Sequence, residues 1–564
     1  MRKLTVFLLL FVIILLGIIT RGYKLGEAPA GLYIDEAGQG YSAYSILKTG
    51  KDEFGKTFPI VFRSFTDFKT PVYIYLIVPL IPIFDLTSFT VRLPSFIFSI
   101  LTLPIIFLLI RKISPKKVAL PLALLTTLLL AISPWHVLFG RTNFECNVAL
   151  FFFLAGVLAF YKALEKPIFF IPSALLFAIA IPAYHSQRIV TPLMLLFLLS
   201  RHRKKIFSKT HPAKQDLALP DKKYAIAGFI IGLLLLLPTL SVALTPGFLA
   251  RAGGLNIFSY GKHPAAGYLS QYDGFFGSVV NNPIFLSSQE FGALYLSYLS
   301  PRNMFILGDY GPRSSFPELG TFFIWQFPFY LYGLYLLLKK RELGELRALT
   351  LAFLLIAPIP AAVTRDPYST IRALPLVVPQ LIIISLGILF FIQKLGQLRL
   401  ARPTILLFIG VFTVLYSTGK LYSSGILLNE YFRPPYWDYG WKEVVKTLDS
   451  LDPNLPIIVD NARSEPYIEL LFLKKFDPEA YQRQNHEVSP EDYYTKLERI
   501  TTVQIGNIIT RGINWEDDLL IKQYLVGDAL FISEDQIERH NLTKVAEIKF
   551  PDKNVAFRVV ETNP

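Results

Sequence analysis

The sequence predicts a mainly α-helical protein that crosses a membrane many times and ends in a small α/β domain. Three observations predict this class. Charged residues make up only 17% of the 564 residues, whereas soluble domains carry about 25%. Apolar runs of roughly 18 residues or more recur along the chain, and each is long enough to cross about 30 Å of hydrocarbon. After about residue 420 these runs stop and the charge density rises.

We expect about eleven membrane-spanning helices, identified by apolar length and flanking charge. They lie roughly at 4–20, 89–110, 118–133, 147–163, 168–183, 189–200, 224–244, 321–338, 348–364, 374–392 and 404–419. A further run at 71–84 contains several prolines and predicts a re-entrant or interfacial segment. The first run resembles a signal peptide, but its length and the closing Arg21 favour an uncleaved first helix.

The loop charges predict the orientation of these helices. Lys and Arg residues gather at 111–117, 201–223 and 339–341, on the same side as the N-terminus if the count of spans is right. The positive-inside rule makes that side cytoplasmic, so we expect a plasma-membrane protein with its C-terminal part outside the cytoplasm. Topology and anionic lipid headgroups account for the net charge of +14, which therefore gives no indication of nucleic-acid binding.

The predicted domains are residues 1–420, in the membrane, and residues 421–564, outside it. In the second, residues 455–460 read as a buried strand, and residues 464–475 as a helix with Ser464 as its N-cap. Two alternating stretches, 545–550 and 555–560, read as a hairpin. The single cysteine, Cys146, excludes an intrachain disulfide and predicts inert packing.

The first outer loop carries two adjacent carboxylates, Asp35 and Glu36, shortly after the first span. A carboxylate at the membrane surface is partly desolvated, which raises its pKa and suits it to act as a general base. A solvated acidic pair that caps the following helix is an equally good interpretation. Lys69, beside aromatic residues, suits a phosphate contact, or it is an interfacial lysine that snorkels to water.

Further candidates lie in the later outer loops. Arg141 and Glu145 are four residues apart, so on a helix they share a face, either as an ion pair or toward a common cavity. Arg188 and Arg372 contradict the positive-inside trend, so their charges need a partner, which is either a lipid phosphate or a structural ion pair. Tyr184 and His185 precede Arg188. His185 is a candidate base or metal ligand, although a lone histidine is more often simply hydrogen-bonded.

The long outer segment 245–320 is rich in Gly, Tyr, Phe and Asn, including 251–256 and 272–274. Loops of this length are usually functional or mobile, and we interpret this one as either a contact for sugar and acceptor or a cover over the spans. No His, Cys or carboxylate cluster has the spacing of a metal site.

Taken together, three short motifs resemble one known family. They are the Asp35-Glu36 pair after the first span, the Lys69-Thr70-Pro71-Val72-Tyr73 run, and Pro134-Trp135-His136 followed by Arg141 and Glu145. This layout resembles the protein O-mannosyltransferase and aminoarabinose-transferase superfamily, the bacterial family-39-like GT-C glycosyltransferases. The resemblance covers residues 1–420.

The resemblance implies that Asp35 is the catalytic carboxylate, that Glu36 binds acceptor or tunes charge, and that Lys69 lies near the donor phosphate. This chain departs from the family at Thr70, where a second proline is common. It also has Asp67-Phe68 where some members place a glutamate that helps hold a metal. We therefore predict no cofactor and leave a divalent metal open.

The sequence-based hypothesis is an inverting glycosyltransferase that acts on the outer membrane face. A polyprenyl-phosphate-linked sugar is the expected donor, with Lys69, Arg188 and Arg372 at its phosphate and Asp35 as base. The expected partners are membrane lipid and an acceptor hydroxyl on protein, lipid or glycan, with Arg141, Glu145, Tyr184 and His185 as substrate contacts. The alternative is a transporter or flippase, for which inverted repeats and mid-span charges are expected. The sequence shows no such repeat.

Overall fold

The computed structural model describes most of the chain. The described ranges are 3–207, 222–246, 282–398, 402–485, 488–489, 491–495 and 499–564, together with Phe248, Ile257, Gly274, Phe275 and Val279. The residues 251–256 and 272–273, singled out above, lie outside this part.

The chain forms two compact units. The helical unit comprises Met1–Tyr23, Ser95–Ser241 and Leu249–Ser424, and the mixed unit comprises Lys24–Pro94, Val242–Phe248 and Gly425–Pro564. The last segment of the helical unit ends at Ser424, and the domain boundary at residue 420 stays a prediction. The mixed unit is not continuous in sequence, because residues 24–94, which follow α1, fold together with the C-terminal residues.

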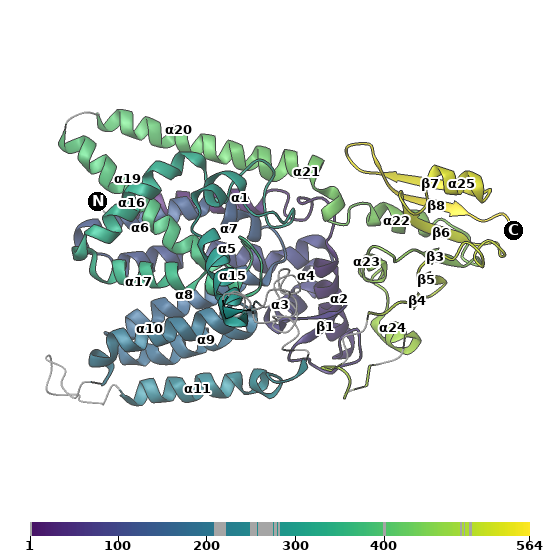
Figure 1. The fold of residues 1–564 in the computed structure, drawn as a ribbon, viewed down its shortest axis with the longest axis horizontal. Helices are drawn as coiled ribbons and strands as arrows, with labels where there is room; N and C mark the ends of the chain where they lie inside the picture. The colour runs from purple at the N-terminus through teal and green to yellow at the C-terminus, as the bar shows by residue number, and fades with distance from the viewer. Residues whose placement is uncertain are drawn as a thin grey trace. The chain divides into compact units, whose positions relative to one another are not determined.

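Apolar helices of five to 26 residues build the helical unit (Figure 1). They are α1 (Lys3–Gly22), α5 (Ser88–Ile113, whose first turns belong to the mixed unit), α6 (Lys116–Ala131), α7 (Pro134–Phe139), α8 (Glu145–Ala163), α9 (Phe170–Ala183), α10 (Gln187–Phe207), α11 (Lys222–Ser241), α15 (Pro283–Ser297), α16 (Phe327–Lys339), α17 (Gly344–Ile356), α18 (Ile359–Val363), α19 (Val377–Gln397) and α20 (Pro403–Tyr422). Each expected span coincides with one of these helices or with two in succession.

Seven helical stretches in the described part are long and apolar enough to cross a membrane, which makes this a multi-pass membrane protein. They are Lys3–Gly22, Ser88–Ile113, Glu145–Ala163, Lys222–Ser241, Arg341–Val363, Leu374–Gln397 and Pro403–Phe432. Two shorter apolar stretches, Pro71–Phe84 and Pro167–Ala183, accompany them. The full number of eleven spans stays a prediction.

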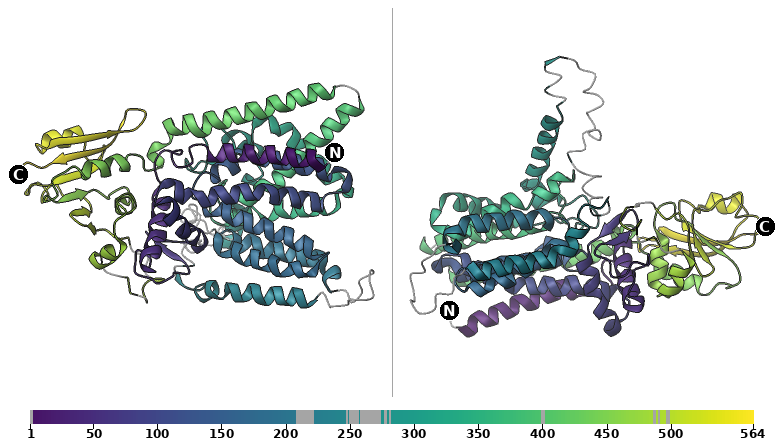
Figure 2. Two further views of the ribbon diagram at one scale, coloured as in Figure 1. Left: turned by 180° about the vertical axis from the view of Figure 1, so that it is seen from behind. Right: turned by 90° about the horizontal axis from the view of Figure 1, so that it is seen from below.

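Small residues let these helices approach closely. α9 packs against α8 and α11, and α19 packs against α16 and α6 (Figure 2). A Cβ atom added at Gly333 of α16 would lie 1.8 Å from Ile383 O, and one at Gly387 of α19 would lie 1.9 Å from Phe329 O. The two backbones therefore touch at glycines on both sides, as membrane helices often do. Cys146 is buried and free, in agreement with inert packing.

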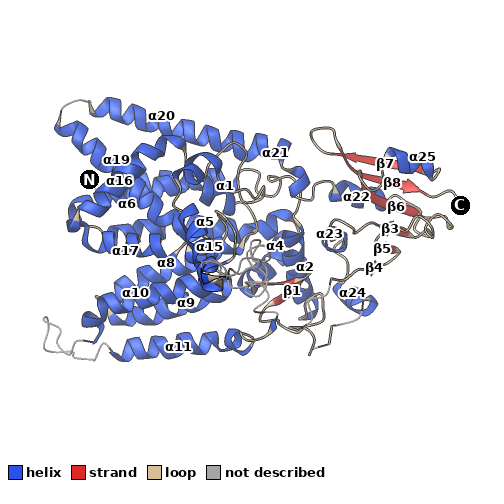
Figure 3. Ribbon diagram, viewed as in Figure 1, coloured by secondary structure: helices blue, strands red, loops and turns tan. Residues whose placement is uncertain are grey.

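All strands among the described residues belong to the mixed unit (Figure 3). Its elements are α2 (Ile34–Thr49), β1 (Phe62–Ser64), β2 (Asp67–Lys69), α3 (Pro71–Ile77), α4 (Ile81–Phe84), α21 (Asn429–Phe432), α22 (Trp441–Leu448), β3 (Ile457–Val459), α23 (Pro466–Leu473), α24 (Pro478–Gln484), β4 (Val503–Ile505), β5 (Ile508–Thr510), β6 (Tyr524–Asp528), α25 (Glu534–Arg539), β7 (Thr543–Lys549) and β8 (Val555–Glu561).

The large sheet has the strand order β4-β5-β3-β6-β8-β7. β3 is parallel to both β5 and β6, whereas the other pairs are antiparallel. The predicted strand at 455–460 and the predicted hairpin are confirmed as β3 and β7–β8. The predicted cap is wrong by one position, because the helix begins at Pro466 and its N-cap is Glu465. Proline is preferred at the first helical position, where its fixed φ and missing N–H cost nothing.

The segment between α1 and α5 is held to the C-terminal residues by buried polar contacts. α2 packs against α23 and α24. Tyr41 donates a hydrogen bond to Phe476 O at 3.1 Å, and Gln482 Nε2 donates to Asp52 O at 2.7 Å. The Tyr493 hydroxyl donates to the Asp52 carboxylate and accepts from Arg63 N–H at 3.0 Å. These contacts explain why sequence-distant segments form one unit.

Asp52 makes the stability of this unit depend on pH. Burial raises the pKa of its carboxyl to about 6, although Tyr493 and the N–H groups of Lys56 and Phe54 partly oppose the shift. The folded protein therefore holds a proton that the unfolded chain releases near pH 4. Asp52 stabilises the fold most at low pH, and that contribution falls by about 1.4 kcal/mol per pH unit between about pH 4 and 6.

We expect Asp52→Asn to flatten this pH dependence. Unfolding midpoints of the full-length protein, followed by tryptophan fluorescence in detergent from pH 4.5 to 7.5, measure the effect. The exposed Asp535→Asn is the matched control and keeps the slope of the wild type. An unchanged slope in Asp52→Asn would show that Asp52 is not the responsible carboxyl.

Candidate active site

Asp35 and Lys69 form an ion pair within the mixed unit. Asp35 is the second residue of α2, where a negative charge is favourable next to the helix N-terminus. Lys69 ends β2 and directly precedes Thr70, the N-cap of α3. Lys69 Nζ lies 2.9 Å from Asp35 Oδ1, with the lysine side chain 9% exposed and the aspartate 25% exposed. One oxygen of a reachable carboxylate is therefore held by a nearly buried cation.

Glu36, the neighbour of Asp35, points elsewhere. Its side chain is 2% exposed and receives Arg92 Nε on Oε1 at 2.9 Å and Arg92 Nη2 on Oε2 at 2.7 Å. Consecutive helix residues project about 100° apart, so one residue of the pair reaches Lys69 and the other is buried against α5. The role of Glu36 in acceptor binding or charge tuning stays a prediction.

Arg92 was not predicted as a site residue, yet all five of its N–H donors have acceptors. Besides Glu36, it donates to Leu25 O at 3.3 Å, Pro29 O at 3.1 Å and Gly31 O at 2.8 Å. The side chain is fully buried. The sequence could have identified Arg92, because an arginine within an otherwise apolar run needs a partner.

Arg141 supports a helix end within the helical unit. The expectation that Arg141 and Glu145 share a helix face is wrong, because α7 ends at Phe139 and α8 begins at Glu145. From the turn between them, Arg141 donates to Thr20 O at 3.1 Å, Arg21 O at 3.1 Å and Tyr23 O at 2.7 Å. These are carbonyls at the C-terminus of α1, which lack partners inside their own helix.

We expect Arg141→Met to destabilise the protein. Each buried carbonyl that loses its donor costs about 1–3 kcal/mol, so the unfolding midpoint should fall clearly below that of the exposed control Arg302→Met. Thermal unfolding in detergent measures this. If Arg141→Met keeps its unfolding midpoint but raises the KM for substrate, the substrate-binding prediction for Arg141 gains support instead.

The remaining candidates also lie in the helical unit. Glu145 opens α8 and is nearly buried. Tyr184 follows α9 as its C-cap, is buried, and has its ring 6.0 Å from that of His185. Arg188 lies in the first turn of α10, where its N–H donates to His185 O at 3.2 Å. Tyr184, His185 and Arg188 thus come together at the α9–α10 turn.

Arg372 forms an ion pair with Asp366. The neighbouring Arg365 pairs with Glu290 at 2.9 Å. Structural pairing, the alternative interpretation of these arginines, is therefore observed for both of them. A partly exposed Arg372 still has donors for an anion, so its role as a phosphate contact stays a prediction.

Of the predicted site residues, the structure brings together Asp35 with Lys69, and Tyr184 with His185 and Arg188. Asp35, Glu36 and Lys69 belong to the mixed unit, whereas the other candidates belong to the helical unit. Across the described ranges, no group of three or more His, Cys, Asp or Glu residues is arranged to hold a metal ion.

Comparisons with known proteins agree with this architecture. Residues 68–219 match the family model described as dolichyl-phosphate-mannose-protein mannosyltransferase. This stretch includes Lys69, Arg141 and Arg188 but begins after Asp35. No curated protein matches the chain in sequence.

Solved structures also share the fold, two of them over nearly the whole of this chain. ArnT from Cupriavidus metallidurans, bound to undecaprenyl phosphate, has a TM-score of 0.52 at 10% identity, and the alignment covers 100% of both chains. The oligosaccharyltransferase AglB from Archaeoglobus fulgidus, in complex with an inhibitory peptide and a dolichol-phosphate, has a TM-score of 0.50 at 12% identity. That alignment covers 98% of this chain and 74% of AglB. The likeness confirms the predicted fold class.

Proposed function

We propose that this chain is a membrane glycosyltransferase that transfers a sugar from a polyprenyl phosphate to an acceptor hydroxyl on the outer face of the membrane. The match of residues 68–219 to the dolichyl-phosphate-mannose-protein mannosyltransferase model supports this proposal. The observation that carries the proposal is the 2.9 Å ion pair between Asp35 and Lys69. ArnT and AglB, which share the fold, were each solved with a polyprenyl-type phosphate.

The proposed reaction is a single displacement. The acceptor oxygen attacks the anomeric carbon, and its proton passes to the Asp35 carboxylate. The bond from the anomeric carbon to the phosphate oxygen breaks, its electron pair stays on that oxygen, and the polyprenyl phosphate leaves. Attack opposite the leaving group inverts the anomeric centre. Asp35 is suited to this role because its side chain is 25% exposed while Lys69 holds one of its two oxygens, Oδ1.

Lys69 is suited to link the base and the leaving group. An ammonium group has three N–H donors, so it can hold Asp35 Oδ1 and still donate to a phosphate oxygen. A cation placed where negative charge develops lowers the barrier. Glu36 acts as a positioning residue through Arg92. Arg188 and Arg372 stay proposed donor contacts, and Arg141, Glu145, Tyr184 and His185 stay proposed substrate contacts, each to be tested separately.

The test uses the purified full-length protein in vesicles with a polyprenyl-phosphate sugar labelled in the sugar. Envelope extracts supply protein, glycolipid and glycan acceptors, and mass spectrometry identifies the product. We expect label on an acceptor, one unlabelled polyprenyl phosphate for each transfer, and no reaction from nucleotide sugars. Label that crosses the bilayer while still attached to the lipid would instead show a transporter and overturn the proposal.

A further inference from the structure

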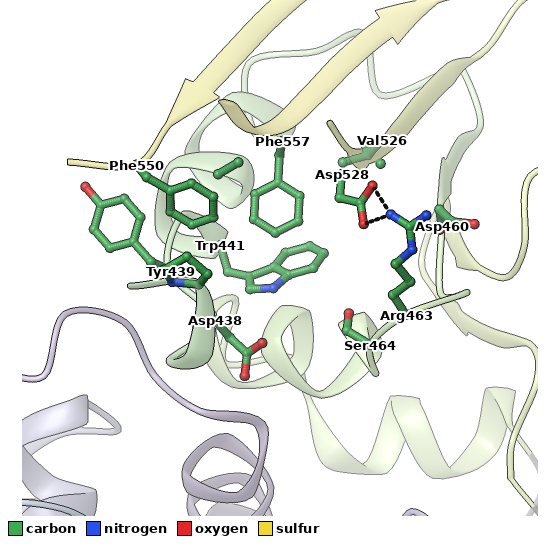
Figure 4. Close-up of a pocket in the computed structure, with 13 residues that line it drawn as sticks. Asp438, Tyr439, Trp441, Asp460, Arg463, Ser464, Val526, Asp528, Phe550 and Phe557 are labelled. Atoms are coloured by element: carbon green, nitrogen blue, oxygen red, sulfur yellow. Dashed lines mark hydrogen bonds and ion pairs between the residues drawn. The ribbon is translucent and has the colours of Figure 1, made fainter. Parts of the chain in front are cut away.

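The C-terminal part of the mixed unit contains a cavity where two parallel strands end. β3 and β6 are neighbours in the sheet and run in the same direction. Asp460 directly follows β3, and Asp528 is the last residue of β6. Both residues line a cavity of about 220 Å³ (Figure 4). Crevices beyond the carboxyl ends of parallel strands are frequent ligand sites in α/β sheets.

The size of this cavity suits a small ligand. One water molecule requires only about 10–15 Å³, whereas pockets for drug-sized molecules measure about 300–1,000 Å³. A cavity of about 220 Å³ lies between these limits, so a single monosaccharide unit or a group of similar size fits.

The charges in the cavity disfavour an anion. Three carboxylates line it, those of Asp438, Asp460 and Asp528, against a single guanidinium, that of Arg463. Arg463 already forms two hydrogen bonds with Asp528, at 2.8 and 2.9 Å. Burial raises the pKa of the Asp460 carboxyl, which reflects its partly desolvated position. A phosphate or an acidic group would therefore meet net negative charge.

Aromatic rings supply the other side of the cavity. Tyr439, Trp441, Phe550 and Phe557 line it, and Figure 4 shows these rings gathered apart from the Asp460–Arg463–Asp528 group. Trp441 and Phe557 lie against each other, with ring centroids 4.7 Å apart. Flat apolar faces combined with a few convergent acceptors are typical of small-ligand sites.

We propose that this cavity binds one uncharged sugar unit of the acceptor. A pyranose ring presents an apolar C–H face to an aromatic side chain and hydroxyl donors to carboxylates, whose charge-assisted hydrogen bonds are strong. An extended peptide offers few hydroxyls, and a phosphate is repelled. The assignment to the acceptor rests on the proposed function, whereas sugar binding itself does not.

One hydrogen bond connects this cavity to the helix of the proposed base. Asp438 lines the cavity and accepts from the Ile34 N–H at 3.1 Å. Ile34 is the first residue of α2, and Asp35 follows it. A sugar held beside Asp438 would thus be bound by a residue that also fixes the N-terminus of α2.

The test is direct binding of methyl α-D-mannopyranoside and methyl β-D-glucopyranoside to the purified full-length protein, without donor. Saturation-transfer difference NMR and tryptophan fluorescence report binding. We expect a Kd on the order of 1 mM, at least a tenfold weaker Kd in Asp460→Asn, and at least tenfold weaker binding of galacturonate. Tyr439→Ala is a second variant should Asp460→Asn fold poorly, and the exposed Asp535→Asn is the control.

Three results would overturn the assignment. They are the absence of saturable binding, sugar binding by Asp460→Asn and Tyr439→Ala that equals that of the wild type, and tighter binding of a short uncharged peptide. The proposed function fails separately. Sugar binding without any transfer in the vesicle assay refutes the transferase proposal and leaves the cavity as a sugar site. Transfer without sugar binding refutes only the cavity assignment.

Discussion

Asp35→Asn is expected to slow sugar transfer by about 10²–10⁴-fold, the usual contribution of a general base, in a protein that folds normally. Asparagine keeps the shape of the side chain and can still accept a hydrogen bond from Lys69 at the position of Oδ1, 2.9 Å away in the wild type. It cannot take the proton of an acceptor hydroxyl. The loss should therefore appear in kcat, while the KM for the lipid-linked donor changes little.

Two further variants distinguish the general-base role of Asp35 from a purely structural role. Glu27→Gln removes an exposed carboxylate from the same loop and should leave transfer unchanged. Lys69→Gln should raise the donor KM as well as lower kcat, because it removes a phosphate contact. If Asp35 only held Lys69 in place, Asp35→Asn, Lys69→Gln and the double variant would all lose the same activity. Substitutions in a pair that acts as one unit are not additive. Full transfer by folded Asp35→Asn would refute the base assignment.

The carboxylate pair illustrates how far the sequence could predict this site. Its position after the first span identified Asp35 and Glu36 together, but residue types alone could not tell which of the two faces inward. The orientation of α2 follows from its contacts with α23 and α24, which begin about 430 residues later in the chain. Glu36 is buried by Arg92, a residue 56 positions away in the chain, which residue types alone do not identify as its partner.

In the fold, too, local sequence patterns predict single elements, whereas long-range contacts decide which segments associate. Apolar length predicted the membrane helices, because a span must satisfy its own backbone hydrogen bonds. The strands and the hairpin after residue 455 also have local signals. The association of residues 24–94 with residues 425–564 depends instead on single long-range contacts, such as Tyr493 with Asp52. The structural partners of Arg141 could not be predicted for a related reason, since they are carbonyls at the end of α1 that no residue pattern marks.

The largest expected loss of stability comes from breaking the Glu36–Arg92 pair. Glu36→Gln leaves the fully buried Arg92 without its counter-charge, and breaking a buried pair typically costs about 3–5 kcal/mol. The unfolding free energy of the detergent-solubilised protein measures this. Lys522→Gln is the matched control, because its pair with Glu561 at 2.9 Å leaves the lysine 60% exposed, and surface pairs contribute about 0–1 kcal/mol.

Arg92→Lys distinguishes charge from geometry at the same place. Lysine keeps the positive charge but has three donors instead of five and lacks the planar fork, so it cannot serve Glu36 and the carbonyls of Leu25, Pro29 and Gly31 together. We expect it to restore part of the stability that Arg92→Met loses, while transfer stays impaired because the loop before Asp35 is no longer fixed. A fully active Arg92→Lys would show that only the charge beside Glu36 matters. The positioning role given to these hydrogen bonds would then be wrong.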